Sequence, residues 1–288
     1  MGTMVSVQVV GHGSSQRARR ERQHAVDRAL GWFTHVESVC SRFDAASELR
    51  QLSTHIGKRV EVSALLFEAV QFAVAVADAS EGAFDPTVGH RMEAAGFDRE
   101  HRTGATARAD VDAPDDVSYR DIELDVDTRT ITLHRPLVLD LGAVAKGLAI
   151  DMAARELAPF ADFAIDAGGD LFLGGHNVGG ESWTVGIRHP IDITQVLETL
   201  VVTDTAVCTS GMYERPGHIL TRPTNEPADA LASVTVVAPS AMVADALSTA
   251  ALALGLSAGA TFLESHNAGA LFVTAGLECT RTRAWSHV

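Results

Sequence analysis

Short strand patterns and longer helical patterns follow one another along the whole chain of 288 residues. Residues 4–10 alternate as a strand does, and residues 16–40 repeat apolar side chains at helical spacing. Residues 64–79 are apolar on nearly every side, which is typical of a buried helix. Because helices and sheets bury their apolar faces against other layers, this order predicts an α/β or α+β fold with mixed sheets.

The rest of the chain continues in the same way. Residues 122–126 and 130–133 alternate around a short polar turn, which predicts a hairpin. Further strands are predicted at 138–141, 163–166, 171–173, 183–187, 197–202, 233–238 and 270–274, and further helices at 144–157 and 239–254. Residues 98–120 are polar and predict a surface excursion. Since no linker divides the sequence, we expect one compact domain over residues 1–288, either simple or bilobal.

Composition and charge narrow the possible functions. Apolar residues make up 46% of the chain, which is enough to exclude general disorder. With 23 basic and 37 acidic residues the net charge is −14, so the chain repels nucleic acid and anionic lipid, and neither is an expected partner. No apolar run reaches the roughly 18 residues of a membrane span. A small polyanionic ligand would need a nearby positive group to offset this negative charge, such as a metal ion, a lysine or a helix N-terminus.

The cysteines bear on the compartment. Cys40, Cys208 and Cys279 are far apart and odd in number, which predicts neither a zinc site nor a disulfide framework. Sparse cysteine fits a reducing cytoplasm. The N-terminus also lacks the basic and apolar segments of a secretory signal. We therefore expect a cytoplasmic protein.

The segment LDLGAVAKG at 139–147 combines a strand, a glycine turn and a helix start. Free backbone N–H groups at such a start can hold an anion, and Lys146 adds a positive charge one turn later. The spacing is not that of a P-loop. The alternative is a plain helix N-terminus with a solvated lysine.

Asp245 and Thr249 lie four residues apart in an apolar predicted helix and therefore share one face. A carboxylate among Ala, Val and Leu side chains should not be buried without a partner. A carboxylate and a hydroxyl suit Mg²⁺, with a backbone carbonyl and phosphate oxygens completing the coordination. The alternative is an Asp that is hydrogen-bonded to a neighbouring loop.

Two glycine-containing segments are less specific. GAFDPTVG at 82–89 predicts an ordered loop after a buried helix, or simply a turn. The paired glycines of DAGGD at 166–170 allow a backbone to approach a ligand closely, although a turn between strands also explains them.

Taken together and in order, these segments resemble the ApbE family of FAD:protein FMN transferases. The match runs from residue 1 to about residue 275 and rests on seven segments: Met1-Gly2-Thr3, Ser41-Arg42-Phe43-Asp44 with Ser47-Glu48-Leu49, GAFDPTVG at 82–89, LDLGAVAKG at 139–147, DAGGD at 166–170, TSGMYER at 209–215 and VTVVAPSAMVADALSTA at 234–250.

The resemblance implies an ApbE-like fold and an enzyme that uses FAD and Mg²⁺. It would move FMN onto a Thr or Ser hydroxyl of a target protein and release AMP. The implied metal ligands are Asp245, Thr249 and the carbonyl of Ala143. The implied FAD contacts, several of them through the backbone, are Met1, Phe43, Ala83, Phe84, Asp85, Asp140, Lys146 and Leu220. His218 corresponds to a family histidine and is our candidate for proton transfer or for orienting the target.

Two departures from the family pattern leave other activities open. The family usually continues the histidine segment as D-P-x-T-G, where this chain has Thr221 to Asn225, and it often has an acidic residue where this chain has Met212. The alternatives are an FAD pyrophosphatase that yields FMN and AMP, and an FAD-binding protein with reduced catalysis. Exported members carry a leader before the Met-Gly-Thr segment, so the resemblance also predicts a cytoplasmic protein.

Overall fold

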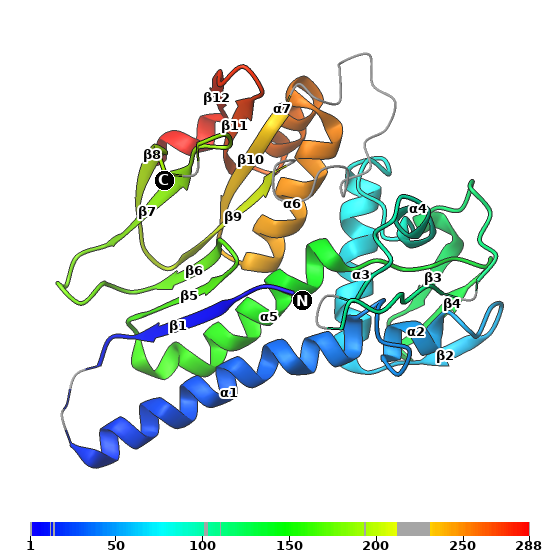
Figure 1. The fold of residues 1–288 in the computed structure, drawn as a ribbon, viewed down its shortest axis with the longest axis horizontal. Coiled ribbons are helices and arrows are strands. Elements are labelled where there is room, and N and C mark those ends of the chain that lie inside the picture. The colour runs from blue at the N-terminus through cyan, green and yellow to red at the C-terminus, as the bar shows by residue number, and fades with distance from the viewer. Residues whose placement is uncertain are drawn as a thin grey trace.

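The computed structural model describes residues 2–11, 13, 15–100, 103–109, 111–192, 194–211 and 231–287. Within these residues, seven strands form one antiparallel sheet in the order β1-β5-β6-β9-β10-β11-β12 (Figure 1). Their bounds are β1 Val5–Val9, β5 Phe163–Ala167, β6 Asp170–Gly174, β9 Thr205–Gly211, β10 Leu231–Ala238, β11 Gly269–Thr274 and β12 Cys279–Arg281.

Long helices cover one face of this sheet (Figure 1). They are α1 Gln16–Cys40, α5 Gly142–Leu157, α6 Ala241–Leu254 and α7 Leu256–Ser265. The other face carries an antiparallel ribbon of β7 Trp183–Arg188 and β8 Val196–Val202. The sheet is therefore buried on both faces, with helices on one side and the ribbon on the other.

The strand residues show how both faces are filled. On β11, Ala270 and Phe272 belong to the core under the helices, whereas Leu271 and Val273 pack with Trp183 of the ribbon. This is the period of two that alternating side chains produce in a strand. Because both faces are apolar, β11 shows as an unbroken apolar run in the sequence.

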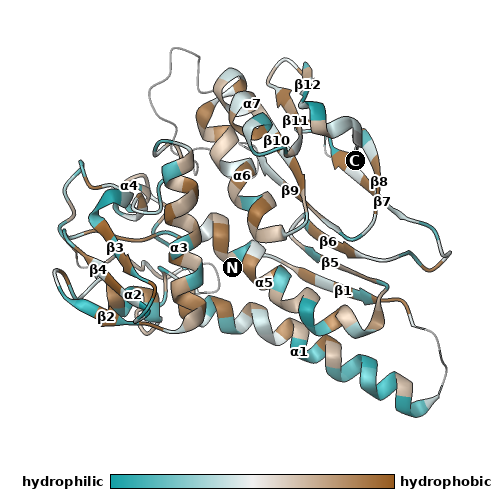
Figure 2. Ribbon diagram, turned by 180° about the vertical axis from the view of Figure 1, so that it is seen from behind, coloured by the Kyte–Doolittle hydropathy of each residue, from teal (hydrophilic) through white to brown (hydrophobic). Residues whose placement is uncertain are grey.

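A smaller unit lies beside the helices (Figure 1). Among the described residues it holds an antiparallel three-stranded sheet of β2 Arg59–Glu61, β4 Thr130–Leu133 and β3 Ile122–Asp125, together with α2 Glu48–Leu52, α3 Ala64–Ala79 and α4 Gly89–Ala94. Short 3₁₀ turns lie at Tyr119–Asp121, Ala158–Phe160 and Arg283–His287. The helix α3 is apolar over most of its surface and contributes several side chains to the main core (Figure 2).

The expected combination of helices and sheets is confirmed. Each described strand pair is antiparallel, whereas a mixed sheet would also hold parallel pairs. The helices predicted at 16–40 and 64–79 and the hairpin at 122–133 are present with nearly the predicted bounds. Within the described residues, no helix combines the length and the apolar character that crossing a membrane requires.

One prediction about local structure is wrong, and another is only partly modified. The strand expected at 138–141 is reduced to a single parallel bridge between Val88 and Val138, because this segment bonds only briefly to the loop at 86–89. The excursion predicted at 98–120 lies mostly at the surface, since only Asp98, Val117 and Tyr119 among its described residues are buried. Asp98 is 7% exposed and pairs with Arg108, and Tyr119 is 4% exposed and donates a hydrogen bond to Asp78 of α3.

The helices α5 and α6 are joined where their backbones approach closely. A Cβ added to Gly147 of α5 would lie 2.4 Å from the carbonyl oxygen of Ala241, at the start of α6. One turn later, the Asp151 carboxylate accepts hydrogen bonds from the Ser240 hydroxyl and from the backbone N–H groups of Ala241 and Met242, at 2.6 to 3.0 Å. A side chain of α5 thus caps α6, which satisfies N–H groups that have no partner within that helix.

We predict that Asp151→Ala destabilises the protein by about 2 kcal/mol, because the N–H groups of Ala241 and Met242 lose their partner and only the Ser240 cap on Val243 remains. Urea unfolding measures this change as a lower midpoint with an unchanged slope. The exposed Asp127→Ala, in the turn between β3 and β4, is the matched control and should keep the midpoint of the unsubstituted protein. Equal midpoints for the two variants would contradict the capping role.

Candidate active site

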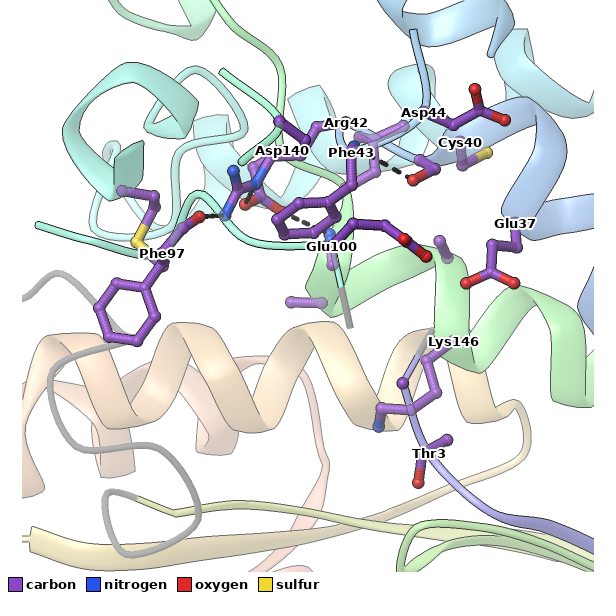
Figure 3. A pocket seen from close by; sticks show the side chains of 18 of the residues that line it. Thr3, Glu37, Cys40, Arg42, Phe43, Asp44, Phe97, Glu100, Asp140 and Lys146 are labelled. Atoms are coloured by element: carbon purple, nitrogen blue, oxygen red, sulfur yellow. Dashed lines mark hydrogen bonds and ion pairs between the residues drawn. The ribbon is translucent and has the colours of Figure 1, made fainter. Parts of the chain in front are cut away.

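A cavity of about 1170 Å³ opens where the helices meet the smaller unit, and Figure 3 shows part of its wall. This volume is somewhat above the roughly 300–1000 Å³ that small-molecule sites occupy, so the cavity has room for a large ligand. The described site residues expected from the sequence all line it: Phe43, Ala83, Phe84, Asp85, Asp140, Ala143, Lys146, Asp245 and Thr249. Segments far apart in the chain therefore converge on one cavity.

The loop after α3 is shaped by its aspartate. Oδ1 of Asp85 accepts hydrogen bonds from the backbone N–H and the hydroxyl of Thr87, at 2.9 and 2.7 Å. Oδ2 accepts one from the N–H of Tyr119 at 3.2 Å. These bonds close an Asx-type turn and tie it to the neighbouring segment. The Asp85 side chain thus holds the loop that places Ala83 and Phe84 in the cavity wall.

The start of α5 is organised by Asp140. Its Oδ1 accepts a hydrogen bond from the N–H of Gly142 at 2.8 Å, which forms an Asx-type turn just before the helix. The N–H groups of Val144 and Ala145 bond to the carbonyl of Leu141. Most of the N–H groups that the sequence offered for an anion are therefore already used within the chain.

Arg42 holds Asp140 from the other side. Its Nε donates to Oδ2 of Asp140 at 2.6 Å, and one terminal nitrogen donates to the carbonyl of Phe97 at 2.5 Å (Figure 3). The guanidinium carbon lies 4.1 Å from the centre of the Phe43 ring, within cation–π range. Arg42 is only 4% exposed, so this pair is shielded from water. Arg42 thereby links the 139–147 segment to the part of the cavity wall that begins at Phe97, and it also packs against Phe43.

Lys146, Asp170 and Asp245 form the charged centre of the cavity. Lys146 reaches from α5 to an ion pair with Oδ2 of Asp170 on β6, and its Nζ lies 3.4 Å from Oδ2 of Asp245 on α6. The two Asp residues are 2% and 5% exposed. The solvated-lysine alternative is therefore wrong, because the ammonium pairs with buried carboxylates. The three side chains together carry one net negative charge.

Thr249 lies one turn after Asp245 on the same helix. Its hydroxyl is 3.0 Å from the hydroxyl of Ser210 on β9, which is also 2.8 Å from that of Ser248. Within the described residues, no three His, Cys, Asp or Glu side chains cluster as a metal site. A cation here would instead use mixed oxygen ligands, which suits Mg²⁺ rather than a transition metal. The net negative charge and the buried Asp245 carboxylate fit such an ion.

The cavity thiol is unsuited to act as a nucleophile. Burial raises the pKa of Cys40 to about 12, and Glu48 adds to the shift. Burial, with a smaller effect of Asp245, also raises the pKa of Cys208, which lies behind the cavity. Since the thiolate is the reactive form, both thiols stay protonated and inert near neutral pH.

Comparison with known proteins decides the family. The sequence model of the ApbE family matches residues 1–272. The chain belongs to the ApbE family.

Relatives of this family resemble the chain over most of its length. The FAD:protein FMN transferase of Treponema pallidum is 31% identical, over 95% of this chain and 82% of that protein, and the one of Haemophilus influenzae is 27% identical, over 93% and 82%. The crystal structure of the ApbE protein of Thermotoga maritima has a TM-score of 0.81 at 26% identity, covering 99% of this chain and 98% of that one. The flavin transferase ApbE of Vibrio cholerae has a TM-score of 0.82 at 26% identity, covering 100% and 96%.

Some site residues that the ApbE resemblance implies are not placed. Met1, His218 and Leu220 lie outside the described residues, as do Met212 and Thr221, where the chain departs from the family pattern. Their roles remain predictions.

The structure adds residues that sequence reasoning missed. Arg42 precedes the expected Phe43, and Asp170 ends the DAGGD segment, but neither was assigned a role. Both are buried charged side chains that line the cavity. Nothing in the sequence pairs Arg42 with Asp140 or Asp170 with Lys146, because each pair joins separate elements of the ApbE fold.

We predict that Arg42→Met lowers the stability of this ApbE-family protein by about 3 kcal/mol, because Asp140 and the Phe97 carbonyl then lose a buried partner. Chemical unfolding gives the value. Arg17→Met breaks an exposed pair with Glu21 and is the control, with no change in the unfolding midpoint expected. If Arg42→Met unfolds at the same midpoint as this control, the buried pair does not stabilise the cavity wall.

Proposed function

We propose that this chain is an FAD:protein FMN transferase. It transfers the FMN half of FAD to a Thr or Ser hydroxyl of an acceptor protein and releases AMP, with Mg²⁺ as cofactor. Relatives that match more than nine-tenths of the chain bear that name. The large cavity, lined by each described residue that the resemblance implies, supports the same function.

One observation carries the proposal. The apolar helix α6 buries a carboxylate, Asp245, in the cavity wall, opposite a lysine and one turn before Thr249. Burying a carboxylate is costly and needs compensation, and Lys146 is shared with Asp170. A divalent cation at this wall would add positive charge beside both carboxylates, next to the place where a pyrophosphate would have to bind.

Asp245, Thr249 and the carbonyl of Ala143 would hold the Mg²⁺. When bound, the ion would neutralise phosphate charge and stabilise the AMP leaving group. Phosphoryl transfer depends on such positioning and charge more than on covalent help from the protein.

The chain's own residues would orient FAD and the acceptor. Phe43, held from behind by Arg42, offers a flat aromatic surface, and Ala83 and Phe84 line the cavity nearby. The acceptor hydroxyl oxygen would bond to the FMN-side phosphorus while the bond from that phosphorus to the AMP oxygen breaks. His218 is our candidate for taking the hydroxyl proton. Met1, Leu220, Asp140 and Lys146 would complete the FAD contacts.

The function is tested by incubating the protein with FAD, Mg²⁺ and a peptide that contains an acceptor Thr. We predict flavin covalently attached to the peptide, with one AMP released for each flavin transferred, as measured by mass spectrometry and chromatography. A peptide with Ala in place of Thr is the control and should stay unmodified. Free FMN and AMP without labelled peptide would instead identify a pyrophosphatase, and bound FAD without AMP would identify a binding protein.

The metal site is tested by Asp245→Asn, which removes the charge but keeps the shape. We predict that metal-dependent AMP release falls by at least about 100-fold, since even outer partners of metal ligands matter about 10- to 100-fold. Circular dichroism and thermal unfolding check that the variant is folded. Asp127→Asn changes an exposed carboxylate in the turn between β3 and β4 and should retain turnover. Unchanged AMP release by Asp245→Asn would refute the metal assignment.

Two further expectations belong with this proposal. The sparse cysteines support a cytoplasmic location, and the sequence without an internal linker supports one domain over residues 1–288.

A further inference from the structure

We propose that Asp170 is a positioning residue that keeps the Lys146 ammonium from occupying the Asp245 carboxylate. This inference rests on the proposed function, because it assumes that Asp245 binds the cation. Asp170 would touch neither the metal nor FAD. It would act through Lys146.

Asp170 is fixed from two directions. Its Oδ1 accepts a hydrogen bond from the N–H of Thr209 on the neighbouring strand β9, at 3.0 Å. Its Oδ2 forms the ion pair with Lys146. At 2% exposure the carboxylate has almost no contact with water, so its partners are protein groups. One oxygen is thus used to hold the carboxylate and the other to hold the lysine.

The backbone before Asp170 contributes to this placement. Gly168 and Gly169 both have positive φ angles, of 68° and 95°, which glycine adopts without strain. A Cβ on Gly168 would lie 2.0 Å from the hydroxyl of Thr3. The N–H of Gly169 bonds to Oδ1 of Asp166 at 2.8 Å. The turn therefore sets the direction in which β6 begins, and with it the position of the Asp170 carboxylate.

Lys146 has two anionic partners, Asp170 and Asp245, and the proposed function assigns Asp245 to the metal. Its contact with Asp170 is direct, whereas its Nζ is 3.4 Å from Asp245. Without the Asp170 charge, the ammonium would have Asp245 as its nearest described carboxylate. It would then compete with a cation for the same oxygen, because a carboxylate paired with an ammonium binds a metal less well. Asp170 would prevent this competition and still leave Lys146 beside the phosphates.

A double-mutant cycle tests the inference, because it separates an effect through Lys146 from a direct effect of charge. The variants are Asp170→Asn, Lys146→Met and the two combined. The control is Asp127→Asn, which changes an exposed carboxylate in the turn between β3 and β4. The readout is the dissociation constant of Mn²⁺ in the presence of saturating FAD, from the loss of the EPR signal of free Mn²⁺. Asparagine can still accept the Thr209 hydrogen bond. Should Asp170→Asn not fold, Asp170→Ser replaces it in the cycle.

We expect Asp170→Asn to weaken Mn²⁺ binding about 10- to 100-fold in the Lys146 background, as loss of an outer-shell partner does. With Met at position 146 the same substitution should have less than about a twofold effect. Asp127→Asn should bind Mn²⁺ like the unsubstituted protein. An equal effect of Asp170→Asn in both backgrounds would overturn the positioning role. Failure of the metal site itself would look different, because Asp245→Asn would then bind Mn²⁺ as tightly as the unsubstituted protein.

Discussion

The contact between α5 and α6 is the constraint on which the cavity depends. Gly147 lets the backbones of the two helices approach, and Asp151 closes the first turn of α6 from the side of α5. Lys146 precedes that glycine, and Asp245 follows the cap by one turn of helix. The same contact therefore stabilises the helix pair and places Lys146 next to Asp245. A larger residue at position 147 would push the two helices apart and would also move Lys146 away from Asp245.

For a small ligand, the charges that line the cavity matter more than the net charge of the whole protein. A net charge of −14 disfavours long polyanions, which meet the field of the whole molecule. A small pyrophosphate meets only the cavity wall, where one ammonium stands between two buried carboxylates among the described residues. The Mg²⁺ that we propose at this wall would add positive charge beside these carboxylates. Acidity of the site and affinity for a phosphate ligand are then compatible.

The periodicity of the sequence predicted those structural features that depend only on residues close together in the chain. The long helices and the hairpin at 122–133 follow from spacing alone, as does the shared face of Asp245 and Thr249. The short strands β2 and β12 were missed because three residues carry no period. The partners of charged groups were missed for another reason: Arg42 and Asp140 are 98 positions apart, and only the fold brings them together. Local patterns singled out Lys146, Asp245 and Thr249, and the resemblance to the ApbE family implied the other expected cavity residues. Tertiary packing decided which of them are paired.

The path of the N-terminal strand bears on where extra residues, such as a tag, can be attached to the protein. The strand β1 pairs along the edge of the large sheet and delivers Gly2 and Thr3 to the cavity wall, beside Gly168. The last turn, Arg283–His287, packs instead through Trp285 into the cluster under the β7–β8 ribbon, on the opposite face of the sheet from the helices (Figure 1). Any residues fused before position 2 would leave the fold at the ligand cavity, whereas an attachment at the C-terminal end would leave it on the far side.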